Sequence, residues 1–144
     1  MGKAGLLRRM KWYQATALFS VAFALVGFSY NVWRLEVTEH NSSVREASFE
    51  SLLQLAELEQ LVFAAHYDQD PEAGNPRVGW VKVGLIVDLS ASCGEGVQAA
   101  ALALKQTWSE DWSSMAAERA ATERIVAAID VPRAAVQDSL AMLD

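Results

Sequence analysis

The sequence predicts an all-α chain, in which a single N-terminal transmembrane helix is followed by a small antiparallel helical bundle. One long uncharged apolar run lies near the N-terminus, and amphipathic segments with three- and four-residue spacing follow it. No convincing pair of strands is present. The expected domains are a basic cytoplasmic stub over 1–11, the transmembrane helix over 12–33 and an acidic extracytoplasmic helical domain over 34–144.

The N-terminal stub is basic, whereas the rest of the chain is acidic. The stub contains no acidic residue and four basic ones, namely Lys3, Arg8, Arg9 and Lys11. Positive charge beside a span marks the cytoplasmic side, so we expect a cytoplasmic N-terminus in a bacterial inner membrane. From residue 34 onward the chain carries eight basic and eighteen acidic residues. Such a domain would be repelled by phosphate backbones, so nucleic acid is not an expected partner.

The expected span, 12–33, contains no charged residue. A helix of this length matches a hydrocarbon core of about 30 Å at 1.5 Å rise per residue. Aromatic side chains at both of its ends suit the depth of the lipid headgroups. These membrane-interface anchors are Trp12, Tyr13, Tyr30 and Trp33. A cleaved signal peptide is the alternative, with small residues at Gly27 and Ser29 near a possible cleavage site.

Small residues recur along one side of the span, at steps of three and four residues. They are Ala17, Ser20, Ala24 and Gly27. Small side chains allow two membrane helices to approach closely, so this side is a candidate helix–helix contact. Ordinary lipid-facing residues are the alternative.

The first segment of the domain predicts an amphipathic helix that begins near Ser43 and ends near Ala65. Ser43 and Glu46 have the spacing of a capping box, in which each side chain satisfies a backbone N–H at a helix start. Apolar residues then recur with helical spacing, while the glutamates lie mostly off that stripe. The segment 34–41 is expected to extend the membrane helix outward, before a break or bend near Asn41.

The segment 78–90 fits two secondary structures, a strand and a helix. Its apolar residues alternate as in a strand, but they also line up along a helix face. We favour a helix that ends at Gly94 or Gly96, because no other segment offers a strand partner.

Two further helices complete the expected bundle. The segment 97–112 carries Trp108 and Trp112 four residues apart, which predicts a core contact. A last helix is expected from Met115 toward Leu143, and Pro132 should kink or split it because proline lacks a backbone N–H.

A polar loop follows the first helix of the domain. Its possible oxygen and nitrogen ligands for a divalent cation are His66, Asp68, Asp70 and Glu72. The cluster does not follow the pattern of an EF-hand, and a polar turn with an Asx cap is the alternative interpretation. No cofactor is implied.

The remaining motifs do not favour an enzyme, and no catalytic residue is assigned. The single cysteine, Cys93, has no basic neighbour in sequence, so we expect a small buried thiol. The expected partners are the lipid bilayer and a protein partner or a second copy of the chain. The first hypothesis is an anchored accessory or scaffold protein. The alternative is a ligand- or ion-sensing helical module that relays to another membrane protein. Three prolines interrupt the chain too often for a long coiled coil.

Overall fold

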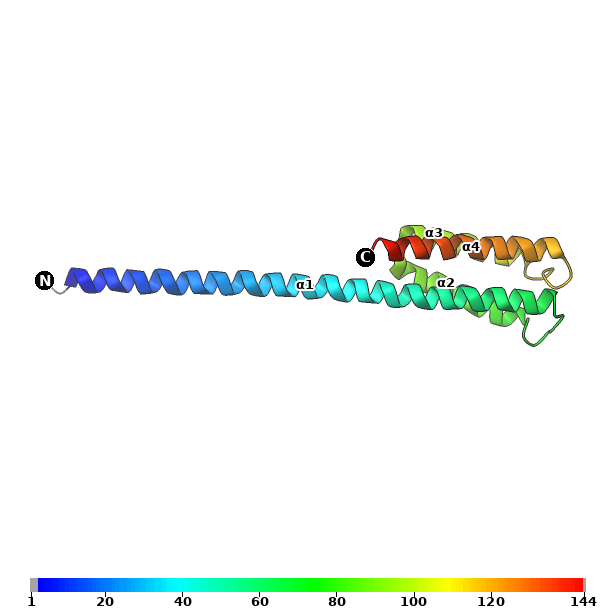
Figure 1. The fold of residues 1–144 in the computed structure, drawn as a ribbon, viewed down its shortest axis with the longest axis horizontal. Helices are drawn as coiled ribbons and strands as arrows, with labels where there is room; N and C mark the ends of the chain where they lie inside the picture. Colours follow the sequence, from blue (N-terminus) through cyan, green and yellow to red (C-terminus); the bar gives the residue numbers. More distant parts are fainter. Residues whose placement is uncertain (1–2, 144) are drawn as a thin grey trace. The chain divides into compact units, whose positions relative to one another are not determined.

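The structure is a computed structural model that describes the backbone of residues 3–143 and the side chains of residues 12–36, 39 and 41–143. Within this described part all regular structure is helical: α1 (Lys3–His66), α2 (Pro76–Cys93), α3 (Glu95–Asp111) and α4 (Arg119–Ala141). The chain divides into two compact units, 1–40 and 41–144. The all-α prediction is therefore confirmed (Figure 1).

The first unit consists of the N-terminal part of α1. Every side chain from Trp12 to Glu36 is exposed, including large apolar ones such as Phe19 and Phe23. This part contains the one stretch of the described chain that is long and apolar enough to cross a membrane, as judged by length and composition. Its hydroxyls bond within the helix: Thr16 Oγ1 donates to the Trp12 carbonyl at 2.8 Å, and Ser20 Oγ donates to the Thr16 carbonyl at 2.9 Å.

The sequence predicts a break or bend near Asn41 and a new helix start at Ser43, and the structure differs. α1 continues through both residues without interruption. The capping box is unnecessary there, because in a continuous helix each backbone N–H bonds to the carbonyl four residues before it. The local Ser-to-Glu spacing therefore does not mark a helix terminus in this chain.

The second unit packs the C-terminal part of α1 with α2, α3 and α4 around one main core. Each helix contributes fully buried side chains to it: Leu55, Leu58, Val62, Val83, Ile86, Leu104, Trp108, Ile125 and Ile129. Figure 1 shows these helices side by side, with short connections between α2, α3 and α4. The amphipathic stripe predicted for the region before Ala65 is thus confirmed as a core-facing stripe.

The ambiguous segment 78–90 is helical, as favoured from the sequence. Asn75 begins α2, since its Oδ1 accepts from the Arg77 N–H at 3.0 Å, and Pro76 occupies the first turn. The helix ends at Gly94, which has a φ of 112°. This conformation strains residues with a Cβ, so glycine suits a corner where α2 and α3 are separated by one residue.

The last helix begins later than expected and is not split. Residues after α3 form turns, and α4 starts at Arg119 instead of Met115. Pro132 lies buried within a continuous α4. A proline inside a helix costs about 3 kcal/mol, and here its ring is covered by the packing of the bundle, which offsets that cost.

The two tryptophans of α3 have different environments. Trp108 is fully buried, whereas Trp112 is 37% exposed. The ring of Trp108 meets that of Trp80 edge-on, with centroids 6.4 Å apart. Gly79 makes room for this contact, because a Cβ there would overlap the Trp108 ring. The core contact predicted for the pair is therefore made fully by one of its members.

Candidate functional site

The loop after α1 places the four predicted metal ligands in separate local interactions. His66 Nδ1 lies 3.1 Å from the carbonyl oxygen of Met115. Asp70 Oδ1 accepts from the backbone N–H groups of Glu72 at 2.9 Å and Ala73 at 3.0 Å. The side chains of Asp68 and Glu72 are exposed. Across the described residues, no group of three or more His, Cys, Asp or Glu side chains is close enough to hold a metal ion.

Asp70 acts as the cap of its own turn. The two backbone N–H groups, Ala73 first and then Glu72, hold the pKa of its carboxyl below the usual range because they stabilise the charged form. This is the Asx turn that the sequence offered as the alternative to a metal site.

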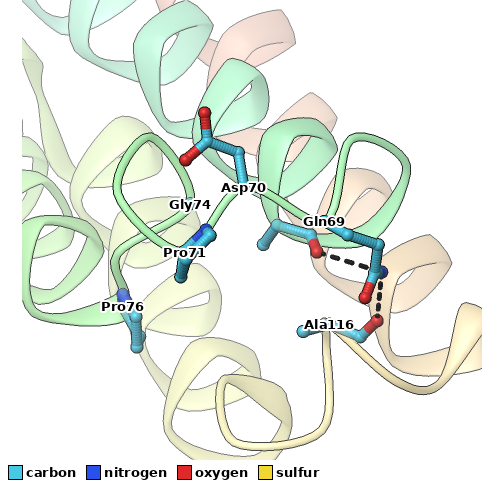
Figure 2. A pocket seen from close by; sticks show the side chains of 7 residues that line it. Gln69, Asp70, Pro71, Gly74, Pro76 and Ala116 are labelled. Carbon is cyan, nitrogen blue, oxygen red and sulfur yellow. Dashed lines mark hydrogen bonds between the residues drawn. The ribbon is translucent and has the colours of Figure 1, made fainter.

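A small hollow of about 270 Å³ lies beside this loop. Figure 2 shows the Gln69 side chain at its edge, where Nε2 donates to the carbonyls of Ala65 at 3.3 Å and Ala116 at 3.1 Å. Gln69 adopts a φ of 52°, which turns the chain sharply after α1. Asp70 is the one charged residue of the lining, and its carboxylate already bonds to the turn. The Gln69 bonds join the two inter-helix loops at this end of the bundle.

Two larger hollows follow the groove between α1 and α2. One, of about 630 Å³, is lined by Glu46, Phe49, Glu50 and Leu53 of α1 and by Leu89 of α2, among others. The second, of about 470 Å³, is lined by Glu57, Phe63 and Asp68 together with Val78 and Lys82, among others. Both hollows are open and shallow, so they suit an extended surface contact better than an enclosed small molecule.

The expectations from the sequence do not include this groove, although the sequence contains a signal for it. α1 carries a second apolar stripe opposite its buried one, with Phe49, Leu53 and Phe63 at multiples of helical spacing. The first stripe alone is enough to make the helix amphipathic, so the amphipathic pattern does not by itself indicate the second stripe. A helix that is apolar on two faces has two surfaces to cover.

Ion pairs tie the helices of the bundle together. Lys82 of α2 pairs with Glu57 of α1, and its Nζ also donates to Gln54 Oε1 at 3.3 Å. Arg133 of α4 pairs with Glu59 of α1. These contacts neutralise two of the glutamates on the flanks of α1.

A further pair joins α4 to the end of α3. Arg124 Nε donates to Asp111 Oδ2 at 2.9 Å, and a second guanidinium nitrogen bonds Oδ1 of the same carboxylate. The Arg124 hydrogen bond holds the pKa of the Asp111 carboxyl below its usual range, while burial opposes this shift.

The single cysteine lies inside the bundle, as expected from the sequence. Cys93 is 4% exposed, and Ser48 Oγ donates to its sulfur at 3.5 Å. Ser139 Oγ donates to the Cys93 carbonyl at 3.0 Å.

The residues predicted to act in the membrane all lie on the exposed surface of α1. Trp12, Tyr13, Tyr30 and Trp33 are each more than 60% exposed. The small residues predicted as a helix contact are also exposed, namely Ala17, Ser20, Ala24 and Gly27. A Cβ added at Gly27 would meet nothing within 4 Å. The side chains of the basic residues Lys3, Arg8, Arg9 and Lys11 lie outside the described set.

In comparisons with known proteins, no family model, no curated protein and no solved structure matches this chain.

Proposed function

We propose that the chain is a single-pass protein of a bacterial inner membrane, anchored by residues 12–33 with its N-terminus in the cytoplasm. The observation that supports the anchor is the exposure of apolar side chains on every side of this part of α1. Leaving a large apolar side chain in water costs about 1.5–3 kcal/mol relative to burial. A run such as Phe19, Phe23 and Phe28 is therefore stable only in lipid or against another apolar surface.

The orientation follows from charge on the two flanks. Lys3, Arg8, Arg9 and Lys11 precede the span without an acid, which supports retention of that end in the cytoplasm. The acidic helical domain then lies on the extracytoplasmic side.

We further propose an antiparallel arrangement of the helices in this domain. Cross-helix partners support it. Along α1 and α2, Ser48 bonds to Cys93 while Glu57 pairs with Lys82, so later residues of one helix meet earlier residues of the other.

Contacts with α4 follow the same order. Arg45 donates to the Leu143 carbonyl at 3.1 Å, whereas Glu59 pairs with Arg133.

The domain serves as an accessory or scaffold module that binds a protein partner. What supports this role is the number of large apolar side chains that the bundle leaves in solvent, including Phe49 at 63%, Leu53 at 51% and Val81 at 71% exposure. Several such side chains close together mark interaction surfaces more often than isolated ones do.

Co-purification of the full chain from its native membranes in mild detergent tests this function. A stoichiometric protein partner is expected in the eluate. A chain that elutes alone as a monomer contradicts the scaffold role. Stabilisation by small molecules or divalent cations in a thermal shift assay, without a protein partner, would favour the sensing module instead.

A further inference from the structure

An unpartnered apolar surface lies on the outside of α1 and α2. Its members are all exposed, and they define what we call the outer face: Phe49, Leu53, Phe63, Val78, Val81 and Leu85. Residues of both helices line the two groove hollows here. Phe49 and Leu53 of α1 line one hollow with Leu89 of α2, and Phe63 of α1 lines the other with Val78 of α2.

The α1 part of the outer face has the spacing of a helix-packing seam. From Phe49 the exposed positions proceed through Leu53, Ala56, Gln60 and Phe63, at alternating steps of four and three residues. This alternation keeps a stripe facing one neighbouring helix that lies along it. The buried residues Leu55, Leu58 and Val62 occupy the other side of α1, so the seam is separate from the core.

The length of the seam sets the length of its occupant. Phe49 to Phe63 covers fourteen residue steps. At 1.5 Å per residue this corresponds to about 21 Å, or about four helical turns. A single amphipathic helix of that length would cover the stripe and both hollows.

The two groove hollows have carboxylates in their linings, and one exposed basic residue, Arg77, adjoins Val78 at the start of α2. Glu46 and Glu50 line the first hollow, and Asp68 lines the second. Among the described side chains, those of residues 12–36, 39 and 41–143, no basic group forms an ion pair with these three carboxylates. Glu57, at the middle of the groove, is already neutralised by Lys82. The ends of the groove therefore attract positive charge, and its middle does not.

We infer that the outer face docks an amphipathic helix of about four turns from a partner protein, with Lys or Arg near both ends of its apolar stripe. This inference rests on the proposed scaffold function, and it names the surface and the chemistry of the partner.

The charge balance selects this occupant over two others. A second copy of the domain would bring eighteen acidic against eight basic residues on each side of the contact, so like charges would meet. An anionic lipid surface would meet the same repulsion from Glu46, Glu50 and Asp68. A basic helix neutralises these carboxylates and covers the apolar stripe at once.

A defined peptide pair tests the inference on the full chain in uncharged-lipid nanodiscs. The probe is a labelled peptide of about fifteen residues, with leucines at alternating three- and four-residue steps and lysines near both ends. Its control has the same leucines but glutamates in place of the lysines. Fluorescence anisotropy should show the basic peptide binding at least about tenfold more tightly than the acidic one, and this difference should shrink at high salt.

Matched variants locate the binding site. Phe49→Ser with Leu53→Ser, and separately Glu46→Lys with Glu50→Lys, should each weaken binding of the basic peptide by at least about tenfold. Leu102→Ser on α3 and Val131→Ser on α4 are the controls, because these side chains are similarly exposed at 50% and 56% but lie off the outer face. Helical circular dichroism should be unchanged in all four variants.

The outcomes separate this inference from the function on which it rests. Equal binding of the two peptides, or equal loss in the Leu102 and Val131 controls, overturns the inference. Self-association that Phe49→Ser abolishes also overturns it, in favour of a second copy. A native partner that still co-purifies with the Phe49→Ser/Leu53→Ser chain leaves the scaffold function standing and rejects the outer face as its site. Absence of any native partner, with peptide binding intact, rejects the scaffold function alone.

Discussion

α1 passes through two regions that differ in how their apolar side chains are distributed. From Trp12 to Glu36 all side chains are exposed, and apolar residues occur on every side. From Val44 onward, buried and exposed positions alternate with the period of the helix. Both regions are helical, so backbone conformation does not distinguish them. The distribution of apolar residues around the axis does, and it indicates which surroundings each region needs.

The exposed leucines of the two regions show this difference most directly. Leu25 is 62% exposed among other apolar side chains, whereas Leu53 is 51% exposed next to the glutamates of the groove. We propose that the same residue type at similar exposure serves insertion in one region and recognition in the other. The following predictions test that division.

The largest effect is expected inside the bundle. Trp108→Ala removes a fully buried side chain and should reduce the free energy of unfolding of the bundle by about 3–5 kcal/mol. Trp112→Ala is the control, because a side chain that is already 37% exposed should lose about 1–2 kcal/mol less than the fully buried one. Urea unfolding of the full chain in mild detergent, followed by circular dichroism, measures both. Equal losses would contradict the burial pattern.

The anchor is tested by a charge placed in each region. Leu25→Arg should impair membrane insertion, since an arginine near the centre of a span costs about 2.5–3.5 kcal/mol. Leu53→Arg should leave insertion unchanged, and it should alter bundle stability by no more than about 0.5 kcal/mol. Alkaline extraction of membranes reports insertion. If Leu25→Arg stays fully membrane-integrated, residues 12–33 are not the anchor.

Two glycines of α2 give opposite predictions. Gly79→Ala should destabilise the bundle by about 1–2 kcal/mol, because the new methyl group would overlap the Trp108 ring. Gly84→Ala meets nothing within 4 Å and should stabilise it by up to about 1 kcal/mol, through the higher helix propensity of alanine. The change in melting temperature of each variant gives the sign of its effect on stability. Two changes of the same sign would contradict the packing of Gly79 against Trp108.

The smallest effect expected is the contribution of Asp111 to the stability of the bundle, and this contribution depends on pH. Its pKa is lowered in the folded state by Arg124, so its contribution is fully present above the unfolded pKa of about 3.9 and is lost as pH falls through the folded value. Asp111→Asn should cost about 0.5–1 kcal/mol at neutral pH, because Arg124 is exposed, and this cost should shrink as the pH falls through the folded pKa of Asp111. Melting curves across this pH range measure it. Glu123→Gln, in an exposed pair with Arg119, is the control and should change little.

The helical class, the core stripe of α1, the helix at 78–90 and its end at a glycine followed from local pattern in the sequence. Periodicity and the need for strand partners are enough to determine such features. The uninterrupted helix through Asn41 did not follow, because local signals favoured a helix start at Ser43. At Pro132 the sequence predicted a kink or a split, and α4 is not split there. At Pro132, burial in the bundle overrides the local cost.

The candidate site was harder to predict because it depends on tertiary structure. The sequence offers the carboxylates near Asp70 as a ligand set or as a polar turn, and only the folded loop shows that Asp70 Oδ1 accepts from two N–H groups of its turn. The outer face combines residues of α1 and α2 that lie far apart in sequence. The sequence also does not show that Lys82 pairs with Glu57, which leaves the carboxylates at the two ends of the groove without a basic partner among the described side chains.

Cys93 gives the molecule a built-in reporter of local opening. It is the single thiol of the chain, it is 4% exposed, and it lies where α2 ends, bonded to Ser48 of α1 and Ser139 of α4. Because so little of this side chain is exposed, its rate of labelling by a thiol reagent should rise when these helices separate from the α2–α3 corner. Each opened molecule gains one adduct at one known place. Local opening of this end of the bundle can therefore be timed on the full chain, without introducing any probe into it.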